Sequence, residues 1–371
     1  MGSQVFGPAV LAIGDGTTQL GCLRVENGRI ASIEDRSQRP DHTLAPGSIL
    51  TPGLIDLHTN GTGRLWFNRE PLETLAAMAS DAPTHGVTSF LPSIMTGSWD
   101  LMLHAARSIS ECINTPAEGA RPLGVHFEGP FLNPEYRRAH PKEFLLAPSP
   151  ARIEALLETW KAGRLRVTMA PELEDAPLAA AELARRGVTL AAGHTAATYA
   201  IGNSAIECGY QILTHAFNGM PPLHHRVSSI LTAFLLDPTA FCEVIADGVH
   251  VSVEHLALLY RLKGLNLVLT TDAMPLVNGL VEEGGVARTK DGVIAGSRLA
   301  LDQAVRNLVA ATGISLAEAI QCATWAPARA MGLENEIGVL APGLRADFVS
   351  WNARNEVTHV FIAGRLVYSN N

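Results

Sequence analysis

Side chains that bind metals or transfer protons stand at the ends of several short apolar runs in this sequence. The residues that end these runs are His58, Glu128, His194, His215, His250 and Asp272. A short apolar run closed by turn-forming or polar residues is typical of a buried strand. Strands that end in this way, with helix-like segments between them, predict a parallel barrel whose carboxyl ends converge on one site.

Glu128, His194 and His215 end the third, fifth and sixth of the expected strands. In a barrel those ends surround one mouth. Two neutral imidazoles and one carboxylate suit a borderline divalent ion and leave a coordination position for water. A lone histidine is as often a hydrogen-bonded core residue, but three residues at one topological level favour metal binding. We therefore predict that the protein binds a single divalent ion. Zn²⁺ is the preferred candidate, and Fe²⁺, Mn²⁺ and Co²⁺ are alternatives.

Asp272 ends the eighth expected strand. A carboxylate beside a water that a metal activates can take its proton and later return it to a leaving amine. Taken alone, an aspartate at such a position favours helix capping, because Asp is a preferred N-cap residue. With a metal set around it, we favour the general base.

The first expected strand ends in His58-Thr59-Asn60. Two histidines in this pattern would offer two more imidazoles to a metal, but Asn60 is a poor ligand for zinc. The sequence therefore favours one metal site over two. His58 is either a weak ligand at a second site or a hydrogen-bonding residue.

Three further residues are candidates for contact with a substrate. His250 follows the seventh expected strand, where the alternative is a surface histidine. Arg226 is a candidate anion clamp in a loop rich in histidine, although a single such arginine is more often solvated. His140 follows Arg137 and Arg138, a basic cluster that could attract an anionic substrate, and such a cluster is also more often solvated.

Strand-like and helix-like segments alternate from residue 51 onward in eight units, the number that a closed barrel needs. The strands are continuously apolar, as expected when both faces of a sheet are covered. We expect strands at 54–58, 88–95, 122–131, 165–170, 188–194, 211–217, 241–249 and 265–272. We expect helices at 71–85, 99–113, 150–160, 177–186, 198–208, 228–236, 253–262, 301–312 and 315–325.

Both ends of the chain are rich in β-like segments and differ from the middle. Near the amino-terminus, Asn27-Gly28 is a strong hairpin signal, because both central positions of that turn tolerate positive φ. At the other end, the runs 346–351, 357–362 and 366–368 look like strands. We predict one β-sandwich domain from residues 1–50 and 336–371, and a (β/α)₈ TIM-like barrel domain from residues 51–335.

Composition narrows the class of protein. The chain has 371 residues, 47% of them hydrophobic, which suits one barrel with a small accessory domain. A net charge of −8 argues against general nucleic-acid binding. The five cysteines form no CxxC pair, and no apolar run approaches the roughly 18 residues of a membrane span. Residues 1–11 lack a basic segment followed by a long apolar one, so we expect no secretory signal. We expect a cytoplasmic protein that binds neither nucleic acid nor membrane.

Several motifs in combination resemble the N-acetylglucosamine-6-phosphate deacetylases of the amidohydrolase superfamily. The most specific are Glu128-Gly-Pro, Asn218-Gly-Met and Ala246-Asp-Gly-Val-His250. The resemblance covers nearly the whole chain, and its final piece, 338–347, is shared widely in the superfamily. It implies a hydrolase that removes the acetyl group of N-acetylglucosamine 6-phosphate, giving glucosamine 6-phosphate and acetate.

The resemblance also implies a role for each candidate residue. It implies metal ligation by Glu128, His194 and His215, with Asp272 as general base and then general acid. The residues that it implies around the sugar phosphate are His140, Asn218, Gly219, Arg226 and His250. In relatives the arginine at the Arg226 position reaches the phosphate across a dimer interface, so a homodimer is implied.

The first strand departs from the family, and other interpretations stay open. Relatives carry either His-x-His with two metals or Gln-x-Asn with one, whereas this chain has His58-x-Asn60. The alternatives are a deacetylase of another acetamido sugar such as N-acetylgalactosamine 6-phosphate, a different amidohydrolase, and a non-catalytic binding protein. A cyclic-amide amidohydrolase would often use a lysine on the fourth strand, and 166–171 has none. The stretch 276–286 shows no motif that indicates a substrate contact.

Overall fold

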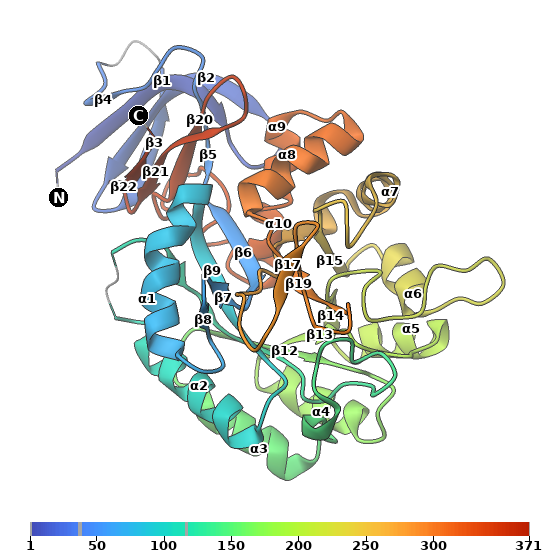
Figure 1. Ribbon diagram of the computed structural model, residues 1–371. Helices are drawn as coiled ribbons and strands as arrows, with labels where there is room; N and C mark the ends of the chain where they lie inside the picture. The colour runs from blue at the N-terminus through green and yellow to red at the C-terminus, as the bar shows by residue number, and fades with distance from the viewer. Residues whose placement is uncertain (1, 36–38, 116–117, 371) are drawn as a thin grey trace.

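A barrel of parallel strands forms the centre of the molecule (Figure 1). The structure is a computed structural model that describes residues 2–35, 39–115 and 118–370. Each barrel strand pairs with the next along the chain. The eight are β6 (Leu54–Thr59), β9 (Val87–Met95), β11 (Gly124–Glu128), β12 (Arg164–Met169), β13 (Thr189–Ala192), β14 (Tyr210–Leu213), β15 (Phe241–Ile245) and β16 (Leu267–Thr270). This confirms the predicted fold class.

The barrel closes between its first and last strands near their carboxyl ends. The Asp272 N–H donates to the His58 carbonyl at 2.8 Å. Nearer the amino ends, the later segment around Ala323 enters the seam, and the Ile55 N–H donates to the Ala323 carbonyl at 2.8 Å. The closure therefore brings two of the predicted site residues, Asp272 and His58, side by side.

Helices follow the strands and cover the outside of the barrel. The helices are α1 (Pro71–Asp81), α2 (Trp99–Cys112), α3 (Pro150–Thr159), α4 (Ala176–Arg185), α5 (Tyr199–Glu207), α6 (Ile230–Leu236), α7 (Val253–Lys263), α8 (Leu301–Thr312), α9 (Leu316–Gln321) and α10 (Trp325–Ala330). Local signals set their ends: proline starts α1 and α3, and Gly313 ends α8 at φ 74°. Because helices cover one face and the barrel interior the other, all nine residues of β9 are buried. None of the helices in the described ranges has the length and apolar character needed to cross a bilayer.

Five of the expected strands extend at least two residues too far, and each error falls at the site. The strands expected to reach 131, 194, 217, 249 and 272 end at Glu128, Ala192, Leu213, Ile245 and Thr270. His194, His215 and Asp272 have φ of 48°, 30° and 47°, in the left-handed region that non-glycine residues rarely adopt. The backbone therefore leaves the sheet just before these residues and turns their side chains into the barrel mouth.

The two ends of the chain share one eight-stranded sheet. Its strands are β1 (Gln4–Ala12), β2 (Thr18–Glu26), β3 (Arg29–Glu34), β4 (His42–Thr43), β5 (Ile49–Pro52), β20 (Phe348–Trp351), β21 (Val357–Ile362) and β22 (Arg365–Ser369). The sheet folds over itself, because the Phe6 ring lies 5.0 Å from the rings of both Phe348 and Phe361. Residues 1, 36–38 and 371 of the predicted terminal domain lie outside the described residues. The boundary at residue 50 stays a prediction, and β5 runs across it.

A three-stranded sheet that the sequence analysis missed is inserted after the barrel. It consists of β17 (Val281–Glu283), β18 (Val286–Arg288) and β19 (Ile294–Ser297). Gly284-Gly285 between the first two strands is a hairpin signal that could have indicated it. The Ser297 N–H donates to the Asp272 carbonyl at 2.8 Å, so the sheet is fastened to the end of β16. Shorter strands elsewhere are β7 (Gly61–Thr62), β8 (Leu65–Trp66) and β10 (Arg121–Pro122).

A buried ion pair crosses the barrel interior beneath the mouth. Arg166 of β12 pairs with His126, two residues before Glu128, and donates to the carboxylate of Glu243 on β15 through both terminal nitrogens. Both side chains are fully buried. Burial opposes the charge on Glu243, but Arg166 outweighs it and lowers the pKa of Glu243 to about 2. The ion pair lies directly beneath the residues of the barrel mouth, and Glu243 Oε2 is 3.9 Å from His58 Nδ1.

We predict that Glu243→Gln lowers the free energy of unfolding by about 3–5 kcal/mol, because the Arg166 charge stays buried without its partner. Glu182→Gln, which breaks an exposed ion pair on α4, is the matched control and is expected to cost less than about 1 kcal/mol. Urea unfolding measures both free energies.

The stabilisation by Glu243 should depend on pH. Because the folded pKa of Glu243 lies below its ordinary value of 4.5, its contribution to the free energy of unfolding is complete above pH 4.5 and is lost as the pH falls toward 2. The gap between wild type and Glu243→Gln should therefore narrow over that range, and a constant gap would contradict the assignment.

Candidate active site

Three predicted metal ligands meet at the carboxyl end of the barrel. Glu128 ends β11, and His194 and His215 follow β13 and β14. Glu128 Oε1 lies 3.2 Å from His194 Nε2 and 3.0 Å from His215 Nε2, and the two imidazole nitrogens are 3.1 Å apart. Three donor atoms at these separations suit the ligand positions around a zinc-sized ion, whose bonds to N and O are about 2.0–2.2 Å long. The residues present therefore fit a divalent metal, as predicted from the sequence.

The surroundings prepare these three side chains for a cation. Burial opposes ionisation of Glu128, but the facing imidazoles of His58, His194 and His215 outweigh it and hold the pKa of Glu128 well below its usual value. His194 Nδ1 donates to the Tyr136 carbonyl at 2.9 Å. Because that bond fixes the proton on Nδ1, the lone pair of His194 Nε2 points into the cluster, as a metal ligand requires.

Asp272 and His58 lie next to this cluster. His58 Nε2 is 3.3 Å from Glu128 Oε2 and 3.4 Å from Asp272 Oδ1, and the Asn60 amide donates to Asp272 Oδ1 at 2.8 Å. Burial and the charge of Glu128 raise the pKa of Asp272, although His58 opposes them. A carboxylate with a raised pKa next to a metal site can accept a proton and give it back. Asn60 thus contacts Asp272, which the sequence alone did not indicate.

His58 completes a second group of possible ligands. Donor atoms of His58, Glu128 and Asp272 lie within 4.8 Å of one another. This group offers only one imidazole and shares Glu128 with the first group, so the first is the better metal site. The arrangement is consistent with the expectation of one well-built site, with His58 at its edge.

The cluster opens into a cavity of about 370 Å³. Almost all the predicted site residues line it: Glu128, His140, His194, His215, Asn218, Gly219, His250 and Asp272. Gly219 has φ 63°, and a Cβ there would stand 2.9 Å from His194 Nδ1, so only glycine fits. Arg138 and Arg288 also line the cavity. The sequence indicated Arg138 only as part of a basic cluster and did not indicate Arg288.

His140 and His250 are both held more tightly than loop histidines usually are. His140 is buried, contrary to a solvated basic cluster, and its Nδ1 lies 2.8 Å from Thr96 Oγ1. Burial, reinforced by His194, lowers the pKa of His140 to about 3, so its ring is neutral at neutral pH. His250 Nδ1 lies 2.6 Å from Asp247 Oδ2. Asp247 was missed in the sequence, although its place three residues before His250 was visible.

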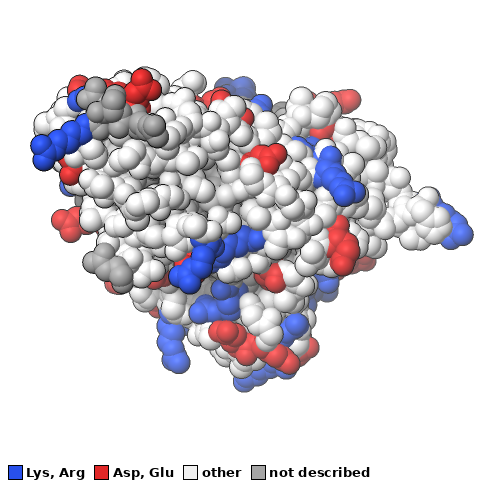
Figure 2. Space-filling view, turned by 90° about the horizontal axis from the view of Figure 1, so that it is seen from above, with Lys and Arg blue, Asp and Glu red and all other residues white. Residues whose placement is uncertain are grey.

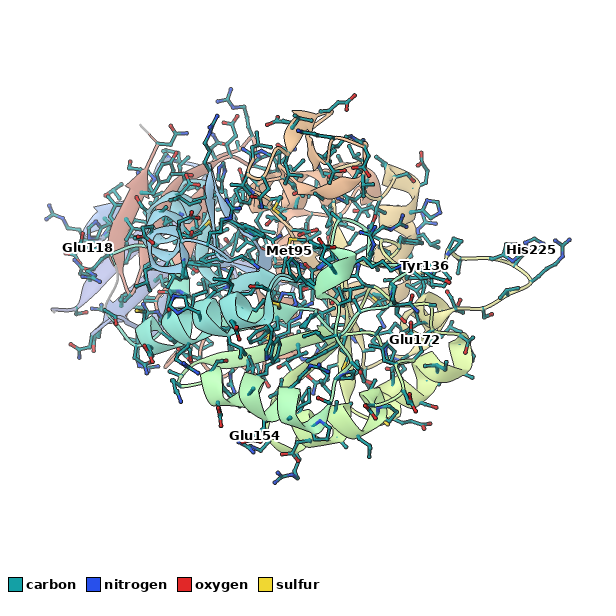
Figure 3. The ribbon with its side chains drawn as sticks, turned by 60° about the horizontal axis from the view of Figure 1, so that its bottom comes forward. Met95, Glu118, Tyr136, Glu154, Glu172 and His225 are labelled. Carbon is teal, nitrogen blue, oxygen red and sulfur yellow. The ribbon has the colours of Figure 1, made fainter. Side chains whose placement is uncertain are left out.

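Arg226 does not line the cavity of its own chain. It is exposed, in the loop after β14. Figure 3 shows the neighbouring His225 at the tip of that loop, far from the barrel, and Figure 2 shows a projection with a basic tip. Within one chain, the structure therefore brings together every predicted site residue except Arg226.

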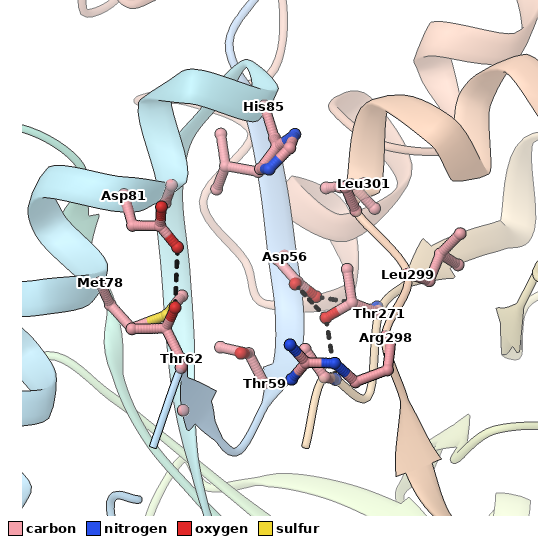
Figure 4. A pocket seen from close by; sticks show the side chains of 16 residues that line it. Asp56, Thr59, Thr62, Met78, Asp81, His85, Thr271, Arg298, Leu299 and Leu301 are labelled. Carbon is pink, nitrogen blue, oxygen red and sulfur yellow. Dashed lines mark hydrogen bonds between the residues drawn. The ribbon is translucent and has the colours of Figure 1, made fainter. Parts of the chain in front are cut away.

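A smaller cavity of about 170 Å³ lies between α1 and the ends of β6 and β16 (Figure 4). Its most notable side chain is Asp56, a charged residue inside an apolar strand. Asp56 accepts hydrogen bonds from the hydroxyls of Thr270 and Thr271 and from the His58 N–H. Asp56 therefore fixes the strand ends that carry His58 and Asp272. A carboxylate within the apolar run 54–58 is a signal of such a role that is visible in the sequence.

A polar cavity with a His/His/Glu cluster and an adjacent carboxylate, at the carboxyl end of a (β/α)₈ barrel, defines a class of metal-dependent hydrolases. The sequence matches the Amidohydrolase family over residues 49–367, and the chain belongs to that family.

Two curated relatives cover most of the chain. The N-acetylgalactosamine-6-phosphate deacetylase of Escherichia coli O157:H7 is 34% identical over 93% of this chain and 94% of its own. The human N-acetylglucosamine-6-phosphate deacetylase is 34% identical over 93% of this chain and 91% of its own. A variant of the Mycobacterium smegmatis N-acetyl-D-glucosamine-6-phosphate deacetylase, solved in complex with N-acetyl-D-glucosamine-6-phosphate, matches with a TM-score of 0.91 and 29% identity over 100% of both chains.

We predict that Glu128→Gln and His215→Ala each abolish stable metal binding. Each change removes a donor atom from the cluster, which should weaken binding by more than the roughly 10- to 100-fold that loss of an outer-shell partner costs. Metal analysis after loading and dialysis measures this, with the exposed His224→Ala as the control. Full metal retention in both variants would exclude this cluster as the binding site.

Proposed function

We propose that the protein hydrolyses the acetamide of N-acetylglucosamine 6-phosphate to glucosamine 6-phosphate and acetate. The single observation that carries the proposal is the convergence of Glu128, His194, His215 and Asp272 in one cavity. Relatives named as deacetylases of acetamido-sugar phosphates, similar over more than nine-tenths of the chain, support the substrate class.

We assign the metal position to Glu128, His194 and His215, and propose zinc as the ion because two imidazoles and a carboxylate suit it. When bound, such an ion supplies a lowered pKa for water and polarisation of a carbonyl oxygen. The chain has to orient the acetamide, move one proton twice and hold the phosphorylated sugar.

We assign the proton transfers to Asp272. Its Oδ1 is held by Asn60 and faces His58, so Oδ2 is left for the proton of the attacking water. The same carboxyl then returns the proton to the departing amine nitrogen, and the bond to the acetyl carbon breaks. His140, Asn218, Gly219 and His250 line the rest of the cavity and are assigned to the sugar phosphate.

The substrate is tested by acetate release from the metal-loaded protein. We expect faster release from N-acetylglucosamine 6-phosphate than from its galactosamine epimer or from unphosphorylated N-acetylglucosamine. A preference for the epimer would move the assignment to the other deacetylase activity among the relatives. No release from any of the three would refute the proposed reaction.

We predict that Asp272→Asn lowers kcat by at least about 100-fold, because an amide cannot accept the proton. Since the folded pKa of Asp272 is raised above its ordinary value of 3.8, wild-type activity should fall on acidification at a pH above that value. Steady-state rates across the pH range measure this, and metal content serves as the control. Near-full turnover of a metal-loaded Asp272→Asn enzyme would exclude this role.

We further propose a homodimer in which each Arg226 enters the site of the other chain. The support is its position: the side chain is exposed on a projecting loop and outside the cavity of its own chain. We also propose a cytoplasmic location, since all five cysteines are free.

Mixing two impaired variants tests the dimer. Arg226→Gln lacks the proposed phosphate contact, and Asp272→Asn lacks the base. A hybrid dimer contains one site with an intact Asp272 and an intact Arg226, so we expect activity well above that of either variant alone after subunit exchange. If Arg226 acted within its own chain, mixing would restore nothing. Sedimentation of the wild type provides the oligomeric state.

A further inference from the structure

We propose that Arg138 and Arg288 of the same chain form an intrachain clamp for the phosphate of the substrate, in addition to any contribution from a partner. This inference rests on the proposed function, and it assigns phosphate selectivity to Arg288, which no sequence motif marked, and to Arg138, which the sequence marked only as part of a basic cluster.

Arg138 and Arg288 both line the cavity that contains the Glu128, His194 and His215 cluster. Arg138 forms no ion pair with any of the described residues, and the nearest carboxylate to Arg288, that of Glu283, lies 3.8 Å away. The Arg288 side chain is 26% exposed, so it is only partly solvated. Two arginines without a close carboxylate partner, at the rim of a polar cavity, are well suited to a dianionic phosphate, because guanidinium matches phosphate oxygens in geometry and charge.

Arg288 is positioned by the inserted sheet, which is fastened to the proposed base. The Ser297 N–H of β19 donates to the Asp272 carbonyl at 2.8 Å, and the Met274 N–H donates to the Ser297 carbonyl at 3.0 Å. Ser297 pairs with Val286 of β18, the strand that carries Arg288 two residues later. The Arg288 side chain also donates to the Gly292 carbonyl at 3.0 Å. Its distance from the reacting centre is therefore set by backbone pairing.

Arg138 is positioned by the loop that orients a metal ligand. The Tyr136 carbonyl accepts the bond from His194 Nδ1, and Arg138 follows two residues later. Its backbone has φ 52°, a conformation that glycine adopts most easily. Arg137 donates to the carbonyls of both Arg138 and His140, which fixes this turn. A strained backbone at a charged residue beside a site is the kind of outlier that points to function.

The experiment compares Arg138→Gln, Arg288→Gln and Arg288→Lys with the wild type, each metal-loaded. The control is Lys290→Gln, which removes a charge from the same hairpin but outside the cavity. Acetate release is measured with N-acetylglucosamine 6-phosphate and with N-acetylglucosamine. Calorimetric titration with glucosamine 6-phosphate and with inorganic phosphate tests the clamp without requiring turnover.

We expect each Gln variant to lose about 10- to 100-fold in kcat/KM for the phosphorylated sugar, the effect of one charge-assisted hydrogen bond. The loss should stay below about 2-fold for the unphosphorylated sugar and for Lys290→Gln, with metal content unchanged. The loss in kcat/KM for Arg288→Lys should lie between that of Arg288→Gln and that of Lys290→Gln, because lysine keeps the charge but not the bidentate geometry of arginine. Binding of glucosamine 6-phosphate should weaken in parallel.

Two results would overturn the clamp. One is unchanged selectivity and unchanged phosphate binding in both Gln variants. The other is an equal loss on both sugars, which indicates a structural role. These results differ from failure of the proposed function, in which the wild type releases no acetate while the titrations still report on phosphate binding.

Discussion

The structure depends on one buried carboxylate. Glu128 lies almost without solvent at the mouth of the barrel, and such a charge costs several kcal/mol unless it is paired. Imidazole nitrogens of His58, His194 and His215 lie within 3.0–3.3 Å of its two oxygens. These histidines come from three other strand ends, so the pairing exists only when the strands are in register. A shift of one strand by one residue would turn its histidine away and leave the charge uncompensated.

The residues around this cluster restrict its freedom layer by layer. Below it, the Arg166–Glu243 ion pair spans the barrel interior and presents Glu243 Oε2 at 3.9 Å from His58 Nδ1. Behind it, Asp56 joins the ends of β6 and β16, because its carboxylate accepts hydrogen bonds from the Thr271 hydroxyl and the His58 N–H. Without Asp56 these buried donors would lack a partner. A set of side chains held by fixed neighbours can present a site without reorganising when a ligand arrives.

The sequence predicted the positions of site residues well where an apolar run ended in a polar residue, and less well in loops and short polar strands. Short apolar runs that recur along the chain reveal the order of the strands. From that order follow the barrel and the common position of Glu128, His194 and His215 at the carboxyl ends of its strands. The exact ends of the strands do not, because the left-handed φ of His194 depends on tertiary hydrogen bonds. Short polar strands such as β18 carry too few apolar residues to be recognised. The burial of His140 and the distance of Arg226 from its own site depend on loop paths, for which residue type gives no rule.

The Glu128, His194 and His215 cluster and the rest of the cavity lining stand on different parts of this fold, and the two parts are joined at the backbone of Asp272. The metal cluster and Asp272 stand at strand ends, where the barrel fixes them. The other residues that line the cavity stand on loops and on the inserted sheet, which can vary without disturbing the barrel. The link is the hydrogen bond from the Ser297 N–H to the Asp272 carbonyl, since it fixes the position of β19, and of β18 paired with it, relative to Asp272. A change in this sheet can therefore alter which amide reaches the cluster while the Glu128 pairing stays intact.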